Sequence, residues 1–92
     1  MLGERLRLLR ESKGLLQREV AAKLDVDTAY ISKMESNEKP VSRIHLKKLA
    51  ALLDINEDEL LTLWLTNKIL KTIEEEENQE TTLKLALDYV KS

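Results

Sequence analysis

The chain has 92 residues, with no cysteine, no phenylalanine, two glycines and one proline. The absence of cysteine excludes disulfides and thiolate metal sites, and the scarcity of glycine and proline argues against a sheet protein with many turns. The formal net charge is −2, but residues 1–48 carry eleven Lys and Arg against seven Asp and Glu, whereas residues 49–92 carry four against ten. The basic half could bind the phosphates of a nucleic acid, and the acidic half could face solvent or a protein partner. Two ordinary solvated surfaces would give the same distribution of charge.

The sequence predicts an all-α protein with no membrane span, because β-branched alternation is missing and no apolar run is long enough to cross a bilayer. No signal peptide is evident, so we expect a cytoplasmic protein. The first helix is expected over residues 2–13, where Leu2, Leu6 and Leu9 repeat on one face. Gly14 follows at the position where a left-handed residue ends a helix.

Residues 17–37, QREVAAKLDVDTAYISKMESN, have the pattern of two short helices joined by a tight turn. The first is expected over 17–24 and the second, with Asp27 as its N-cap, over 28–35 or 28–36. Apolar or small residues mark the inner faces of the pair, namely Val20, Ala21, Leu24, Ile31 and Met34. The opposite face of the second helix presents Thr28, Ala29, Ser32 and Lys33. This is the pattern of a helix-turn-helix, whose second helix enters the major groove of DNA.

The next helices are expected over residues 43–53, with Ser42 as N-cap, and 57–73, with Asn56 and Glu59 as a capping box. The second of these is apolar around much of its circumference, so it needs cover on more than one side. A second subunit or the final helix would supply that cover. We therefore assign a dimer interface to Leu61, Trp64, Leu65, Ile69 and Ile73, with Trp64 fitting an interface anchor or the core equally well.

Four consecutive acids, Glu74–Glu77, break this helix, and Asn78 can cap a last helix over 79–91. Its stripe consists of Leu83, Ala86, Leu87 and Val90. The stripe would allow the helix to fold back, to exchange between protomers or to contact another protein. We divide the chain into a DNA-binding domain at 1–65 and a helical extension at 66–92.

Three segments together, LRLLRESKGLLQREVAAKL, YISKMES and PVSRIHLKKLAALLDINEDEL, resemble the XRE family, which includes lambdoid phage repressors and restriction–modification controller proteins. The resemblance covers roughly residues 1–62 and implies a five-helix, repressor-like domain, to which the final helix is an addition. Two positions depart from the family pattern. Asp25 stands where the turn usually has Gly, and Leu16 replaces the usual Thr or Ser cap.

The resemblance also assigns roles to individual residues. Thr28, Ala29 and Lys33 match base-reading positions, with Ser32 on the same face. Phosphate contacts are expected from Gln17, Arg18, Tyr30, Asn37, Lys39 and Arg43, with Asn37 in a left-handed conformation. Arg10 and Glu35 match an ion pair that ties the first helix to the end of the recognition helix.

The sequence thus predicts a sequence-specific transcriptional regulator that binds an inverted-repeat operator of double-stranded DNA as a homodimer, with a restriction–modification controller slightly favoured. The alternative is an antitoxin or interaction module whose acidic C-terminal helix binds a protein partner. An enzyme is not expected, because there is no nucleophile–base set, no metal-ligand cluster and no glycine-rich phosphate loop. His45 is the single histidine and stands alone, so neither a metal nor a cofactor is expected.

Overall fold

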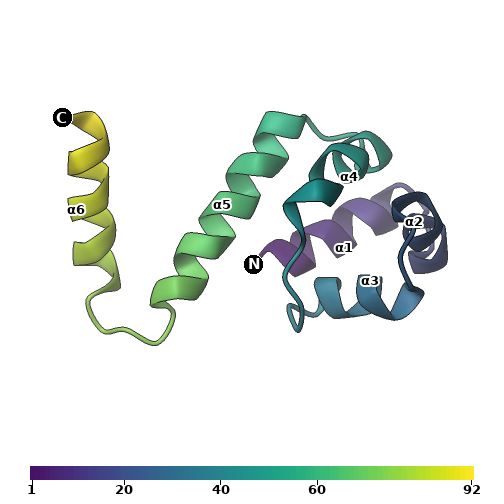
Figure 1. The fold of residues 1–92 in the computed structure, drawn as a ribbon, viewed down its shortest axis with the longest axis horizontal. Helices are drawn as coiled ribbons and strands as arrows, with labels where there is room; N and C mark the ends of the chain where they lie inside the picture. Colours follow the sequence, from purple (N-terminus) through teal and green to yellow (C-terminus); the bar gives the residue numbers. More distant parts are fainter.

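The computed structural model describes residues 1–92 and is entirely helical (Figure 1). Its elements are α1 (Leu2–Ser12), α2 (Gln17–Leu24), α3 (Thr28–Glu35), a 3₁₀ turn η1 (Arg43–His45), α4 (Leu46–Leu53), α5 (Glu57–Ile73) and α6 (Gln79–Lys91). The predicted all-α, repressor-like architecture is therefore confirmed. None of these helices is long and apolar enough to cross a membrane.

Helices α1 to α5 surround one hydrophobic core, and α2 and α3 pack most extensively against each other. The largest fully buried side chains are Ile31 from α3, Leu49 from α4 and Leu60 from α5. Ala21 on α2 is 3 % exposed, and its small side chain lets the two helices of the motif approach closely. Because the core contains no phenylalanine, aliphatic side chains from five helices and one tryptophan fill it.

Left-handed residues end three of these helices. Asp25 has φ 57° and ends α2, Asp54 has φ 54° and ends α4, and Gly14 has φ 67° after α1. After Asp25, the Val26 N–H donates to the Ala21 carbonyl at 3.0 Å, which satisfies an end carbonyl of α2. The departure from Gly at the turn is thus accommodated, because Asp is among the residues that tolerate this conformation.

The helix starts differ from the sequence predictions in their hydrogen bonds. Asp27 and Ser42 precede their elements but make no side-chain cap hydrogen bond, and the expected helix over 43–53 begins as the separate 3₁₀ turn η1. Asn56 does cap α5, since its Oδ1 accepts from the Glu59 N–H at 3.1 Å. Leu16 has no side chain that could cap α2, and only the reciprocal half of a capping box forms, in which the Leu16 N–H donates to Glu19 Oε1 at 2.9 Å.

Of the two alternatives for Trp64, the single chain shows the core, while the dimer interface itself stays a prediction. Its side chain is 8 % exposed and belongs to the core, and its indole N–H donates to the Val41 carbonyl at 2.6 Å. Leu61 is half-buried against the same core and Ile73 is buried near the end of α5. Trp64 is therefore a structural residue within one chain, because α5 directs its most apolar face towards α1 and α4.

Helix α6 projects away from the five-helix domain and is joined to α5 by the acidic segment (Figure 1). No residue of α6 is buried, so the helix does not fold back onto α5. Its large apolar side chains are exposed, namely Leu83, Leu85, Leu87, Tyr89 and Val90. On α5, Leu65 and Ile69 are also exposed, at 43 % and 52 %. This leaves the C-terminal part of the chain with apolar surface that the chain itself does not cover.

Candidate nucleic-acid interface

The outer face of α3 carries the four residues predicted to read bases. Thr28, Ala29, Ser32 and Lys33 are all exposed, whereas Ile31 and Met34 on the inner face are 1 % and 2 % exposed. The helix therefore presents short side chains near its N-terminus and one long cation a turn later. A recognition helix needs this profile to lie close to base edges in the major groove.

A buried ion pair fixes the end of this helix against α1. Arg10 Nε lies 2.7 Å from Glu35 Oε2 and Arg10 Nη2 lies 3.1 Å from Glu35 Oε1, while Nη1 donates to the Leu15 carbonyl at 2.8 Å. The hydrogen bonds to Glu35 raise the pKa of Arg10. The structure thus brings together the two residues expected to pair. The bidentate geometry fixes the relative orientation of α1 and α3.

Gln17 joins the same network, which differs from its predicted role. Its Nε2 donates to Glu35 Oε1 at 3.0 Å, so the amide expected to meet a phosphate is used within the protein. Glu35 consequently accepts hydrogen bonds from α1 and from the start of α2. Three helices are held at one carboxylate, and Gln17 acts here as a structural link between the two helices of the motif.

Asn37 has the predicted left-handed conformation, with φ 63°, but its polar groups are committed within the chain. Its Oδ1 accepts from the Gly3 N–H at 3.0 Å, its Nδ2 donates to Glu4 Oε1 at 2.8 Å, and its own N–H donates to the Met34 carbonyl at 3.2 Å. Asn37 thus has a structural role within the chain, and its phosphate contact stays a prediction. The hydrogen bond from the Met1 ammonium, assisted by Asn37, lowers the pKa of Glu4.

Tyr30 is half-buried and also contacts the protein rather than extending into solvent. Its hydroxyl donates to the Pro40 carbonyl at 3.3 Å and accepts from the Ser42 N–H at 3.4 Å. Its ring packs at a tilt against His45, with 5.9 Å between centroids. Tyr30 thereby holds the loop after α3 and the turn η1 beside the recognition helix.

The cations predicted to contact phosphate are exposed, and the five ion pairs of the structure do not include Arg18, Lys39 or Arg43. Arg43 lies over the Trp64 ring at 5.7 Å, and Lys68 lies over the same ring at 4.6 Å. Sequence reasoning did not single out Lys68. The only signal was its spacing, one turn after Trp64 on α5.

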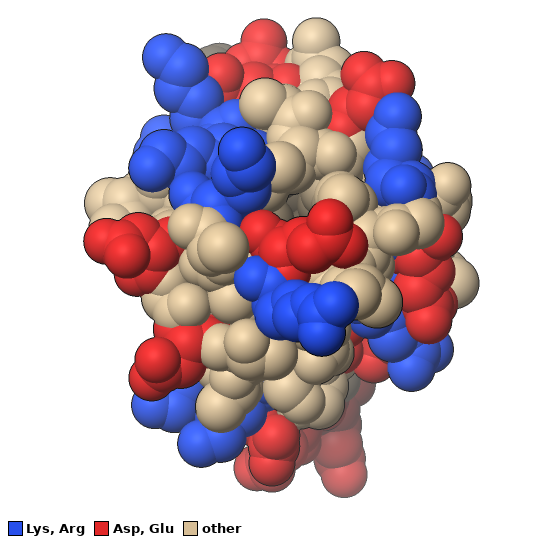
Figure 2. All heavy atoms as spheres, turned by 90° about the vertical axis from the view of Figure 1, so that its right-hand side faces the viewer, with Lys and Arg blue, Asp and Glu red and all other residues tan.

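Charges of both signs share one end of the molecule. Figure 2 shows the end of the molecule beside α2, where Lys and Arg side chains alternate with Asp and Glu side chains. The basic half of the sequence thus does not form one continuous positive face in this view. No group of three or more His, Cys, Asp or Glu side chains is placed to hold a metal ion. The exposed profile of α3 is therefore the better guide to the binding surface.

A recognition helix with an exposed polar face, packed on a supporting helix across a left-handed turn, defines a helix-turn-helix DNA-binding protein. The helix-turn-helix family model matches residues 6–60. The chain belongs to this family, in its XRE-type form, and is a DNA-binding regulator.

Two known proteins place the chain within the family. It is 38 % identical over 61 residues to the control protein C.MunI of Mycoplasma sp., across 65 % of this chain and 82 % of that protein. Its structure resembles a chain of the SinR protein/SinI protein complex, with a TM-score of 0.57 and 28 % sequence identity, across 99 % of this chain and 95 % of that one. The structural similarity thus extends over α6, which lies outside the family match.

Proposed function

We propose that the protein is a sequence-specific, non-catalytic transcriptional regulator that binds an inverted-repeat operator as a homodimer. The observation that carries this proposal is the outer face of α3, with Thr28, Ala29, Ser32 and Lys33 exposed beside a buried inner face. Methyl groups of Thr28 and Ala29 suit contact with thymine, and Lys33 suits donation to guanine O6 and N7. Arg18, Lys39 and Arg43 would add sequence-independent phosphate contacts.

Dimerisation is supported by apolar surface outside the core. Leu65 and Ile69 lie four residues apart on α5 and are 43 % and 52 % exposed, and α6 has no buried residue at all. Pairing of two chains through α5 and α6 would cover this surface. We place the interface on Leu65, Ile69 and the α6 stripe, with Trp64 supporting it from the core.

Within this class we favour a controller role of the restriction–modification type. The sequence resembles such controllers, and a relative is named a control protein. The chain would then act in the cytoplasm, where the DNA that it regulates lies.

Binding to DNA from upstream of the protein's own gene, compared with random duplex across a salt series, tests the proposal. We expect a preference of about 10³-fold or more for the upstream site, with affinity falling steeply as salt rises. Equal affinity for both duplexes would contradict sequence-specific regulation. A Lys33→Ala variant assayed in parallel separates base reading from general attraction to phosphate.

A second candidate function is binding of a protein partner through α6. It is favoured by the exposed apolar side chains of α6 and by the similarity to a chain of the SinR protein/SinI protein complex, an assembly of two different proteins. In this case the purified chain would be monomeric, and variants of Leu87 and Val90 would lose the partner while retaining DNA binding. Sedimentation of the purified protein distinguishes the two: a dimer supports the homodimer, and a monomer supports the partner-binding role.

A further inference from the structure

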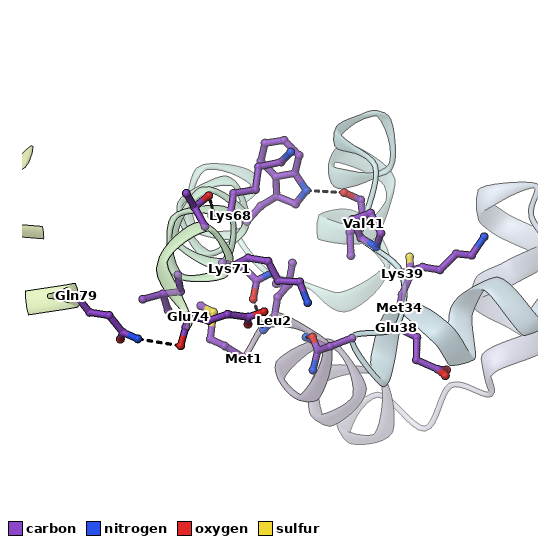
Figure 3. A pocket seen from close by; sticks show the side chains of 17 residues that line it. Met1, Leu2, Met34, Glu38, Lys39, Val41, Lys68, Lys71, Glu74 and Gln79 are labelled. Carbon is purple, nitrogen blue, oxygen red and sulfur yellow. Dashed lines mark hydrogen bonds between the residues drawn. The ribbon is translucent and has the colours of Figure 1, made fainter. Parts of the chain in front are cut away.

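A groove of about 750 Å³ opens between the start of α1, the loop after α3 and the C-terminal half of α5 (Figure 3). Leu2, Met34 and Trp64 contribute to its apolar lining, and Lys39, Lys68 and Lys71 add three cations. Figure 3 shows Lys71 extending into the groove, Lys68 lying across the indole, and Lys39 at the rim with its amine turned outward. Lys68 and Lys71 thus lie on the α5 side of the groove, Glu38 and Glu74 also belong to its lining, and the opposite wall is the loop that follows the recognition helix.

Two cations, Arg43 and Lys68, lie close to the ring of Trp64. The Lys68 amine lies 4.6 Å and the Arg43 guanidinium 5.7 Å from the centre of its ring, and the hydrogen bond to the Val41 carbonyl fixes the indole. No carboxylate pairs with either cation, because neither occurs in an ion pair of the structure. Both residues are exposed, so both cations are free to bind an anion.

We propose that Lys68 and Lys71 bind DNA backbone phosphates and extend the DNA contact from η1 onto α5, beyond the helix-turn-helix module. This inference rests on the proposed function. Arg43, in the turn that Tyr30 holds beside α3, already belongs to the surface assigned to phosphate. Lys68 continues that surface across Trp64, and Lys71 continues it by one further turn of α5. The family match ends at residue 60, so both lysines add to what the module supplies.

The predicted signature is a change in salt dependence without a change in sequence preference. Each phosphate contact on B-DNA contributes about 0.9 to the slope of log affinity against log salt. The double variant Lys68→Ala/Lys71→Ala should therefore reduce the steepness of this slope by about two. It should weaken binding to the operator and to random duplex by the same factor. Both side chains are exposed, so the fold should be retained, which circular dichroism verifies.

The matched control is Lys84→Ala/Lys91→Ala, which removes the same charge from α6. This control should leave the slope unchanged, and Lys68→Arg/Lys71→Arg should restore it. An unchanged slope in the Lys68→Ala/Lys71→Ala protein, or an equal reduction in the α6 control, would overturn the inference. Failure of the proposed function would be seen in the unmodified protein, which would then show no preference for its upstream site. The present inference is decided by the salt slopes of the α5 and α6 variants.

Discussion

The backbone N–H of Gly3 donates to Oδ1 of Asn37 at 3.0 Å, and the two residues fix the start of α1 against the end of the recognition helix. A Cβ on Gly3 would lie 2.5 Å from the Glu35 carbonyl oxygen and 2.7 Å from both the Met34 carbonyl oxygen and Asn37 Oδ1. Since two of these atoms are backbone, the contact cannot be relieved by rotating a side chain. The close packing of α1 against the end of α3 therefore requires a glycine at position 3.

Replacing this glycine should destabilise the domain. We expect Gly3→Ala to lower the free energy of unfolding by about 1–3 kcal/mol, because α1 must move away from the end of α3 to admit the methyl group. Urea denaturation followed by circular dichroism measures the change. Arg5→Ala, at an exposed position of the same helix, is the control and should change stability by less than about 0.5 kcal/mol. Equal stability of the two variants would show that α1 can move away from the end of α3 without loss of stability.

Removing one partner of the Arg10–Glu35 pair should destabilise the domain strongly, whereas replacing both partners with apolar residues should destabilise it little. Side chains of the pair are only 11 % and 6 % exposed, so Glu35→Ala leaves a guanidinium largely buried and should cost about 3–5 kcal/mol. The double variant Arg10→Met/Glu35→Leu should recover much of that loss, since no charge then remains to be desolvated. Chemical denaturation measures both values, and adding the single variants Arg10→Met and Glu35→Leu completes a double-mutant cycle. Additive losses would indicate that the pair contributes no coupling.

Lys33 should discriminate between bases. If it donates to a guanine, Lys33→Ala costs about 1–3 kcal/mol on the operator and relaxes preference at one base pair. A binding assay over operators substituted at each position measures this. Arg18→Ala serves as the comparison, because loss of a phosphate contact weakens every duplex alike. If Lys33→Ala also weakened all duplexes equally, its role would be that of a phosphate contact.

The two kinds of apolar residue on α5 should respond differently to substitution. Leu65→Lys/Ile69→Lys alters exposed positions and should give folded monomers in sedimentation, since charged groups then face each other across the proposed interface. Trp64→Ala removes a core side chain and its hydrogen bond to Val41, and should cost about 3–5 kcal/mol of stability. A Leu65→Lys/Ile69→Lys protein that still dimerises would move the interface to α6 alone.

The helices could be predicted from the sequence because residues close together in the chain determine where a helix ends and which of its faces is apolar. Apolar spacing indicated the faces of the helices, Asn56, Glu74–Glu77 and Asn78 indicated the bounds of α5 and α6, and Gly14 and Asp25 marked left-handed ends. The partners of polar side chains were harder to predict. Gln17, Asn37 and Tyr30 can contact DNA or protein with equal chemistry, and only the folded chain brings Glu35, Gly3 and Pro40 within their reach.

The apolar residues of α5 posed a related problem. A helix that is apolar on several sides gives no sign of which side meets its own core, so Trp64 fitted the interface and the interior equally. The depth of that side chain depends on η1 and on the loop before it, which present the Val41 carbonyl to the indole. The 3₁₀ form of η1 was likewise not visible in the sequence.

The lone tryptophan gives this protein a built-in optical reporter. Its indole is buried, hydrogen-bonded to the loop after α3 and flanked by Arg43 and Lys68. Because tryptophan emission depends on nearby charge and polarity, a phosphate arriving at these cations should alter the fluorescence without any added label. The same signal should change when the core unfolds. Association with DNA and loss of the folded domain can thus be followed in one sample with the unmodified chain.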